Sequence, residues 1–346
     1  MTLFDVFQSV IVPRRVPRGL RMSPWVNRAM WNAWRAYGLR MSDETKREDF
    51  LSTYAPFFLV SILMIWVAAL IFGYGLMFYG LRVHLEPTPT FGGSLYFAGT
   101  TLLTIGYGDI APRGAPARFL AIFAGATGFA TVAIVTSFLF MVFSAFQNRE
   151  VFVTRLSALA GAPPSGVEIL QASAAMHARL GLDELFARGQ NWAVTTMETH
   201  LAYPILTSFR SNHDYNSWIA SLGAVMDAAT LLIACVEEAD QHQGQARLMY
   251  RIGGHLVSDF VSFFGLNREE NPGIERDEFE RAHLRLTEAG YRTKPADASW
   301  EHFSSLRVAY AGPLNALATY WSIPPAQWIG DRSSAKITAH APRGTS

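Results

Sequence analysis

Two long, uninterrupted apolar stretches dominate the pattern of hydrophobic and polar positions along the chain. Residues 50–81 and residues 119–148 contain no charged side chain. Each stretch exceeds the roughly 20 apolar residues that an α-helix needs to cross the hydrocarbon core of a bilayer. The pattern therefore predicts two transmembrane helices, over about 54–80 and about 117–147.

The segment between the two predicted spans contains a third, shorter apolar stretch. Residues 93–103 are too few to cross a bilayer, and a short hydrophobic piece beside a span is typical of a re-entrant helix. Pro87 and Pro89 precede it and prevent a continuous helix from the first span. We predict a re-entrant helix over 93–103, followed by a loop over 104–109.

The residues before the first span predict an amphipathic helix. Ser23 followed by Pro24 forms a good helix start. Apolar side chains then recur on one helical face, at Val26, Met30, Trp34 and Tyr37. This pattern favours a helix in the membrane interface, and packing on the C-terminal domain is the alternative. Residues 1–49 are predicted to form a basic cytoplasmic N-terminus that contains this helix.

The distribution of charge predicts how the spans are oriented. Nine Lys and Arg residues precede the first span, whereas three lie between the spans. The positive-inside bias places the N-terminus in the cytoplasm, and two crossings return the chain to the same side. We therefore expect a multi-pass protein of the cell membrane, embedded in its lipid bilayer, with both termini cytoplasmic.

The C-terminal half shows helical periodicity and no run of alternating β-branched residues. Residues 149–325 are predicted to form an all-helical cytoplasmic domain. Its candidate helices are 165–180, 183–203, 214–238, 244–264, 274–289 and 299–322. Residues 326–346 are rich in Pro, Ser, Arg and Gly, and we predict a disordered tail there.

One stretch of this half admits two interpretations. Residues 218–236 are apolar but carry Asp227 near their centre. An aspartate in a membrane helix costs about 2.5–3.5 kcal/mol on insertion scales, so a buried helix of the soluble domain is preferred over a third span. Asp227 then needs a partner or a polar pocket, which makes it a candidate regulatory site for an unknown ligand.

The loop between the spans carries the chemistry. A dehydrated potassium ion needs a ring of oxygens, and backbone carbonyls supply it when successive residues turn their C=O groups inward. This requires alternating right- and left-handed backbone angles, which residues with a Cβ tolerate poorly. Gly106 and Gly108 remove that penalty at alternate positions. Thr104 can add a hydroxyl oxygen, Tyr107 can pack behind the carbonyls and Asp109 can anchor the outer mouth.

At these positions the sequence closely resembles the potassium channel family. The run Thr104, Ile105, Gly106, Tyr107, Gly108 and Asp109 matches the family's filter signature, and the likeness extends over residues 50–150. The resemblance implies a pore-loop fold with two transmembrane helices in a pore domain over 50–148. It also implies that the carbonyls of four residues coordinate K⁺: Thr104, Ile105, Gly106 and Tyr107.

One copy of the loop cannot surround an ion, so the chain is expected to form a homotetramer around a central axis, as the family does. In the second span, Gly128 is a candidate gating hinge, with close helix packing as the alternative. One helical face is a candidate pore lining, with Phe140 as a hydrophobic constriction or, alternatively, a residue that faces lipid or the first span. The residues of this face are Val132, Thr136, Phe140 and Ser144.

The expected function is passive, selective K⁺ conduction, gated at the inner end of the second span and modulated by the helical domain. The alternatives are a K⁺ transporter subunit and a membrane-tethered sensor or adaptor. We expect no enzyme activity, no cofactor and no nucleic-acid partner, because no catalytic, nucleotide-binding or zinc motif is present. The spacing of His177, His200, His213, Asp214, Asp240, His242, His255, His283 and His302 matches no metal-ligand pattern.

Overall fold

The computed structural model describes residues 3–5, 23–175, 181–211, 216–237, 243–266 and 274–329. The chain divides into two compact units, which we call the membrane unit (Met1–Ser144) and the helical unit (Ala145–Ser346). The described residues are mainly helical, and the prediction of an all-α membrane protein is confirmed. Within these described ranges, three helical segments are long and apolar enough to cross a membrane: Glu44–Gly80, Ala115–Ala160 and Trp218–Cys235.

The first predicted span is helix α4, Tyr54–Gly80. Helix α5, Phe91–Leu102, is the predicted re-entrant helix and begins slightly earlier than expected. The Thr90 side chain accepts a hydrogen bond from the Gly93 backbone N–H at 3.2 Å and so caps the first turn. Helix α5 packs against α4, where the Phe78 and Phe97 rings meet edge to face at 4.7 Å.

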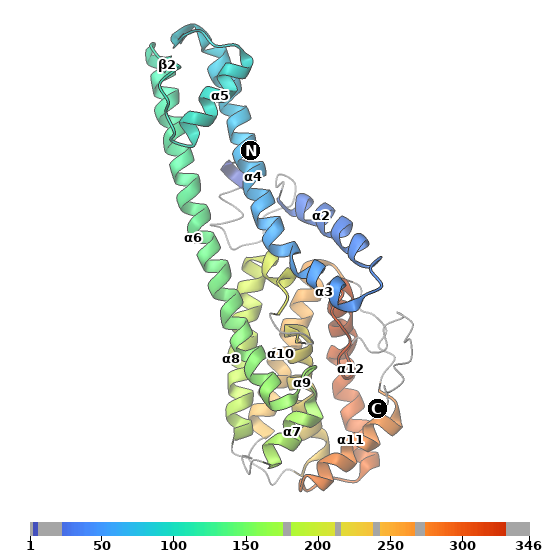
Figure 1. The fold of residues 1–346 in the computed structure, drawn as a ribbon. Coiled ribbons are helices and arrows are strands. Elements are labelled where there is room, and N and C mark those ends of the chain that lie inside the picture. Colours follow the sequence, from blue (N-terminus) through green and yellow to red (C-terminus); the bar gives the residue numbers. More distant parts are fainter. Residues whose placement is uncertain are drawn as a thin grey trace. The chain divides into compact units, whose positions relative to one another are not determined.

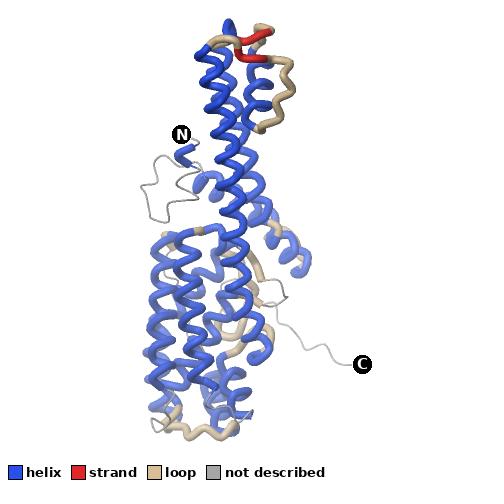
Figure 2. Tube along the Cα trace, turned by 90° about the vertical axis from the view of Figure 1, so that its left-hand side faces the viewer, coloured by secondary structure: helices blue, strands red, loops and turns tan. Residues whose placement is uncertain are grey.

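The segment between α4 and α5 is not helical throughout, as the prolines predicted. It contains the short 3₁₀ helix η2, Arg82–His84, and strand β1, Leu85–Glu86. Strand β1 pairs antiparallel with strand β2, Ala111–Pro112, and Figure 2 shows this small pairing in red. The pairing joins the two ends of the segment that contains α5 and the following loop.

Helix α2, Ser23–Gly38, and helix α3, Glu44–Ser52, precede α4 in the membrane unit. Helix α2 packs on α3 and on the start of α4. The Trp31 ring is buried and meets Tyr54 at 4.9 Å, and Trp34 stacks on Phe50 at 4.7 Å. The predicted apolar face left out Trp31, which is buried, and included Tyr37, which is exposed. The side of α2 that makes contacts is therefore rotated about the helix axis from the predicted face.

Helix α6, Ala115–Ala160, contains the second predicted span and continues well beyond residue 147. Its last turns belong to the helical unit, where Phe152, Val153 and Leu156 are buried at helical spacing. Gly161, which has a φ of +78°, follows the helix and suits its end. Helix α6 therefore extends beyond the predicted span, because the apolar periodicity carries on past the charged pair at 149–150, and the end of the span near residue 147 stays a prediction.

The helical unit contains six further α-helices over its described residues, and Figure 1 shows several of them running alongside one another. They are α7 (Gly166–Ala175), α8 (Gly181–Ala202), α9 (Trp218–Cys235), α10 (Gln243–Phe264), α11 (Arg276–Glu288) and α12 (Ala296–Tyr320). A 3₁₀ helix, η3 (Pro204–Ser208), follows α8.

Helix α9 is the central helix of this unit. Every one of its residues is buried, and helices α7, α8, α10 and α12 pack around it. Ser217 caps its first turn by accepting hydrogen bonds from the backbone N–H groups of Ile219 and Ala220. Because α9 has no exposed face, the structure favours the interpretation of this stretch as a buried core helix rather than a third span.

The ordered part of the helical unit extends past the predicted start of the tail. Ala326, Trp328 and Ile329 are buried, and a β-bridge joins Ala326 to Ile329. Gly223 of α9 makes room for this segment, since a Cβ there would lie 1.7 Å from the Ile329 side chain. The predicted boundary at 325/326 is therefore too early. Residues 330–346 lie outside the described part of the chain.

Candidate functional site

The loop after α5 has the alternating backbone that the sequence predicts at its glycines. Gly106 and Gly108 have φ angles of +61° and +79°. Thr104 also lies in the left-handed region, with a φ of +56°, which the sequence did not predict because Thr has a branched Cβ. Left-handed residues therefore alternate at 104, 106 and 108, a geometry that turns successive carbonyls toward one side.

Hydrogen bonds fix the start of this loop to the C-terminal end of α5. The Ile105 backbone N–H donates to the Thr100 carbonyl at 2.8 Å, and the Gly106 N–H lies 3.3 Å from the same oxygen. The Thr104 N–H donates to the Thr101 carbonyl at 3.1 Å. These bonds hold Thr104 in its strained conformation and satisfy carbonyls at the negative end of the helix dipole.

The outer end of the loop has a neighbouring side chain that the sequence did not predict. The Tyr96 hydroxyl of α5 lies near the Asp109 carboxylate. We had predicted that Asp109 anchors the outer mouth without naming its partner. The available signal was Tyr96 itself, an aromatic side chain with a hydroxyl group, one turn before Thr100 in this short helix. Thr100 points elsewhere, because its hydroxyl donates to the Phe97 carbonyl at 3.1 Å.

Side chains of the loop are exposed in the single chain. Tyr107 is 71% exposed, and Leu103 and Ile105 are each nearly half exposed. The Tyr107 ring was predicted to pack behind the carbonyls, and its own chain leaves most of the ring uncovered. An apolar and aromatic surface of this kind is typical of an interface that other copies cover.

Gly128 lies where α6 passes the end of α5. A Cβ at Gly128 would lie 1.7 Å from the Leu102 carbonyl oxygen and 2.7 Å from its carbonyl carbon. Gly125, one turn earlier, has room, since its Cβ would lie 3.8 Å from the Thr101 oxygen. The structure thus gives Gly128 a definite packing role, because α6 can approach the base of the loop only where a side chain is absent.

The candidate pore-lining residues share an exposed stripe of α6. Val132, Thr136, Phe140 and Ser144 are all exposed in the single chain, and Phe140 is 75% exposed. The opposite side of α6 packs toward α4, where the Thr127 and Tyr74 hydroxyls lie 2.7 Å apart. The stripe is therefore free to line a cavity that several copies of the chain would enclose.

Asp227, the candidate regulatory residue, has partners inside the helical unit. Its Oδ1 accepts a hydrogen bond from the Tyr310 hydroxyl at 2.6 Å, and Arg307 Nε lies 3.3 Å from the same atom. Arg307 also donates to the Trp328 carbonyl at 2.5 Å. This buried pair ties α9 and α12 to the C-terminal segment, so the partner that Asp227 requires is Arg307 rather than a ligand.

A second buried charge network lies where α6 enters the helical unit, and the sequence analysis did not identify it. Arg149 is 2% exposed and pairs with Glu150 at 2.9 Å. Its guanidinium donates to the carbonyls of Leu206 and Phe209 at 3.0 and 2.8 Å. Burial lowers the pKa of Arg149, and the Glu150 carboxylate opposes that effect.

His200 of α8 completes this network. Its Nε2 lies 3.2 Å from Arg149 Nη1, and its ring is fully buried beside Trp218. Burial and then the Arg149 charge hold the pKa of His200 well below its usual value of 6.5. The ring is therefore neutral and accepts the Arg149 hydrogen bond.

The other histidines do not assemble into a metal site over the residues that the structure describes. No group of three or more His, Cys, Asp or Glu side chains there has the arrangement to hold a metal ion. His177, His213, Asp214, Asp240 and His242 lie outside the described residues. Burial raises the pKa of the Cys235 thiol to about 12, so this cysteine is a core residue and a poor nucleophile.

Comparison with known proteins assigns a class to the membrane unit. Residues 59–145 match the family model Ion_trans_2, described as an ion channel. This stretch contains most of α4, all of α5, the 104–109 loop and most of the membrane part of α6. The match and the re-entrant helix between two spanning helices identify residues 59–145 as an ion-channel domain.

A curated relative extends the comparison beyond this domain. The chain is 24% identical over 186 residues to "Uncharacterized membrane protein YdjJ" of Bacillus subtilis (strain 168). The alignment covers 52% of this chain and 54% of that protein, so the chain spans about half the length of this relative. No solved structure matches the chain.

Proposed function

We propose that the protein is a potassium-selective channel that conducts K⁺ passively across the membrane. The observation that carries this proposal is the alternation of left-handed residues at Thr104, Gly106 and Gly108, within a loop that follows a re-entrant helix. In this geometry the carbonyls of Thr104, Ile105, Gly106 and Tyr107 replace the hydration shell of K⁺. The ion-channel match over residues 59–145 supports the same class of function.

The functional assembly in this proposal is a homotetramer. Four copies of the 104–109 loop surround the ion, and a single chain has only one such loop. The exposed rings and aliphatic side chains of the loop, together with the exposed stripe on α6, give each copy a surface for its neighbours and for the central cavity. Asp109, near Tyr96, lies at the outer mouth in this proposal.

The gate in this proposal is a constriction on α6. Val132, Thr136, Phe140 and Ser144 line the inner cavity, and four Phe140 rings close it by excluding water. Gly128 allows the backbone of α6 to pack closely on the backbone of Leu102. Because this contact holds α6 at Gly128, the residue acts in packing and not as a free hinge. The excess of basic residues before α4 supports an orientation in the cell membrane with both termini in the cytoplasm.

The two alternative functions receive less support from the same observations. A transporter built from several linked pore units would need further loops of this kind in the chain, and this sequence has one. A sensor that uses the membrane unit only as an anchor gains nothing from Thr104 in a left-handed conformation, which costs roughly 1–2 kcal/mol. A regulatory role of the helical unit is compatible with the channel, because α6 belongs to both units.

The proposal is tested by K⁺ efflux from liposomes that contain the purified protein. We expect Gly106→Ala to abolish efflux, because Gly106 has a φ of +61°, which alanine adopts only with strain. The assembly should persist, because no atom lies within 4 Å of the Cβ position. Gly99→Ala is the matched control, since its Cβ would make ordinary contact at 3.7 Å with Ile71. Undiminished efflux through Gly106→Ala would show that the loop does not carry the ion.

A further inference from the structure

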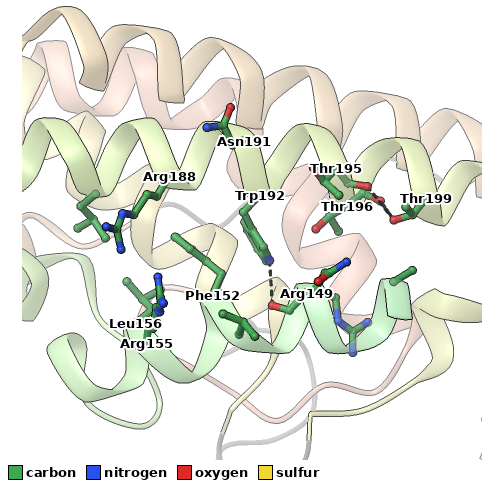
Figure 3. A pocket seen from close by; sticks show the side chains of 14 residues that line it. Arg149, Phe152, Arg155, Leu156, Arg188, Asn191, Trp192, Thr195, Thr196 and Thr199 are labelled. Carbon is green, nitrogen blue, oxygen red and sulfur yellow. Dashed lines mark hydrogen bonds between the residues drawn. The ribbon is translucent and has the colours of Figure 1, made fainter. Parts of the chain in front are cut away.

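The helical unit contains a cavity of about 440 Å³ between the last turns of α6 and helix α8. Its size is within the usual range of small-molecule sites. Figure 3 shows side chains from both helices directed into it. The cavity is separate from the 104–109 loop and from Asp227, so neither the proposed filter nor the Asp227 pair accounts for it.

The charged side chains that line the cavity all have the same sign. They are Arg149, Arg155 and Arg188, and no Asp or Glu is among the lining residues. Arg149 is already committed to Glu150 and to two backbone carbonyls. Arg155 makes no ion pair or hydrogen bond within the described part of the chain, and Arg188 pairs only with the exposed Glu184.

Arg155 of α6 and Arg188 of α8 both line the cavity, and Figure 3 draws them at the same end of it. Two guanidinium groups repel each other unless an anion lies between them. Guanidinium groups also match the geometry of carboxylate and phosphate oxygens, which they bind through paired hydrogen bonds. This end of the cavity therefore has the chemistry of an anion site.

The middle of the cavity is apolar and rigid. Phe152 stacks on Trp192 with ring centroids 4.7 Å apart, and Leu156 and Leu185 line the same region. The Trp192 indole N–H donates to the Arg149 carbonyl at 3.0 Å, which fixes the orientation of the ring. An occupant with an apolar or aromatic body would meet a preformed wall and would order few side chains.

We propose that this cavity binds an organic anion with an apolar or aromatic body. Its carboxylate or phosphate group lies between Arg155 and Arg188, and its body lies against Phe152, Leu156 and Trp192. The same chemistry occurs in soluble organic phosphates and in lipid headgroups. If the proposed channel function holds, occupancy acts on α6, the helix that also carries Phe140.

The test measures binding to the full-length protein in phosphatidylcholine nanodiscs by titration calorimetry. The probe is 1-naphthyl phosphate. Inorganic phosphate and 1-naphthol, which each carry one half of the probe, are titrated separately for comparison. We expect saturable binding of one probe per chain, at least about tenfold tighter than either half. Arg155→Gln and Arg188→Gln should each weaken it by about tenfold or more, the loss expected for a charge-assisted hydrogen bond.

Arg251→Gln is the matched control, because Arg251 is an exposed arginine of α10 outside this cavity. The Arg251→Gln variant should bind 1-naphthyl phosphate with the same affinity as the unchanged protein. Arg155 and Arg188 are both exposed, so an unchanged melting temperature will verify that their variants are folded. Absence of saturable binding, or equal affinity in all three variants, overturns the proposal.

A second arm distinguishes the two sources of the anion. Phosphatidylglycerol in the nanodisc should weaken probe binding in the unchanged protein, and not in Arg155→Gln, if the natural occupant is a lipid headgroup. If phosphatidylglycerol has no effect, the occupant is a soluble anion. Binding is measured without ion flux, so a protein that conducts K⁺ but binds no probe contradicts this inference alone, and one that binds but does not conduct contradicts only the channel proposal.

Discussion

At the scale of single residues, the packing of Gly128 explains how α6 supports the base of the loop. Substitution by Ala would place a Cβ 1.7 Å from the Leu102 carbonyl oxygen, so α6 or the end of α5 must move. Overpacking of this kind typically costs about 1–3 kcal/mol. Leu102 also directly follows Thr100 and Thr101, whose carbonyls accept the hydrogen bonds of the Ile105 and Thr104 backbone N–H groups.

We therefore predict that Gly128→Ala lowers the melting temperature of the assembly and reduces K⁺ efflux by more than about tenfold. Gly125→Ala, one turn away, should retain both properties, because its Cβ would make an ordinary contact at 3.8 Å. Thermal unfolding and liposome efflux measure the two effects. Equal behaviour of the two variants would contradict the packing role.

His200 gives the helical unit a pH dependence whose sign follows from its burial. The pKa of His200 is held well below 6.5 in the folded chain. The unfolded chain therefore binds a proton below pH 6.5 that the folded chain does not, and stability falls as the pH falls from 6.5 toward the folded pKa. Above pH 6.5 the ring is neutral in both states and contributes no slope.

We predict that His200 lowers the free energy of unfolding by about 1.4 kcal/mol for each unit by which the pH falls below 6.5. His200→Gln should remove that part of the slope, whereas the exposed His255→Gln should keep it. A smaller slope of the same sign remains from His302, whose pKa is also lowered by burial. Denaturant unfolding between pH 7 and pH 5 provides the measurement, and an unchanged slope in His200→Gln would exclude a buried neutral ring.

At the scale of elements, hydrophobic periodicity predicted the membrane helices well. The expected first span over 54–80 coincides with α4, since a uniformly apolar stretch has only one way to satisfy its backbone in a bilayer. The continuation of α6 past residue 147 was not predicted, because Arg149 and Glu150 are charged side chains of kinds that are seldom fully buried. In the structure both are buried as a pair, and a sequence does not show which distant carbonyls will accept the hydrogen bonds of a buried arginine.

Local chemistry predicted the candidate site less evenly. The left-handed positions at Gly106 and Gly108 follow from glycine alone, whereas Thr104 adopts its positive φ only because α5 supplies the carbonyls of Thr100 and Thr101. Tyr96 and Arg307 were missed for the same reason, since each meets its carboxylate through tertiary packing.

The exposed stripe of α6 leads to a prediction about the gate. Phe140→Ala should raise resting K⁺ efflux several-fold, because a smaller side chain lets water into a hydrophobic constriction. Phe138→Ala is the control, as it lies about 200° around the helix from Phe140 and is partly buried. Efflux from liposomes at equal protein content compares the two, and a larger effect from Phe138→Ala would place the constriction on another face.

At the scale of the whole molecule, the chain joins an ion-channel domain to a helical unit through one helix. The helical unit has its own core around α9, held by the buried Asp227 and Arg307 pair, and it carries the α6–α8 cavity. Its fold was predicted only as far as its helical content and most of its helix positions, because the contacts that define it join residues far apart in the sequence.

Selectivity tests the central claim most directly. Purified protein in a planar bilayer, with K⁺ on one side and Na⁺ at equal concentration on the other, gives a reversal potential that depends only on the permeability ratio. The account predicts a large reversal potential, negative on the K⁺ side, because the carbonyls of residues 104–107 replace the hydration shell of K⁺ and not that of Na⁺. A reversal potential near zero, or one that follows the Na⁺ gradient, would contradict it.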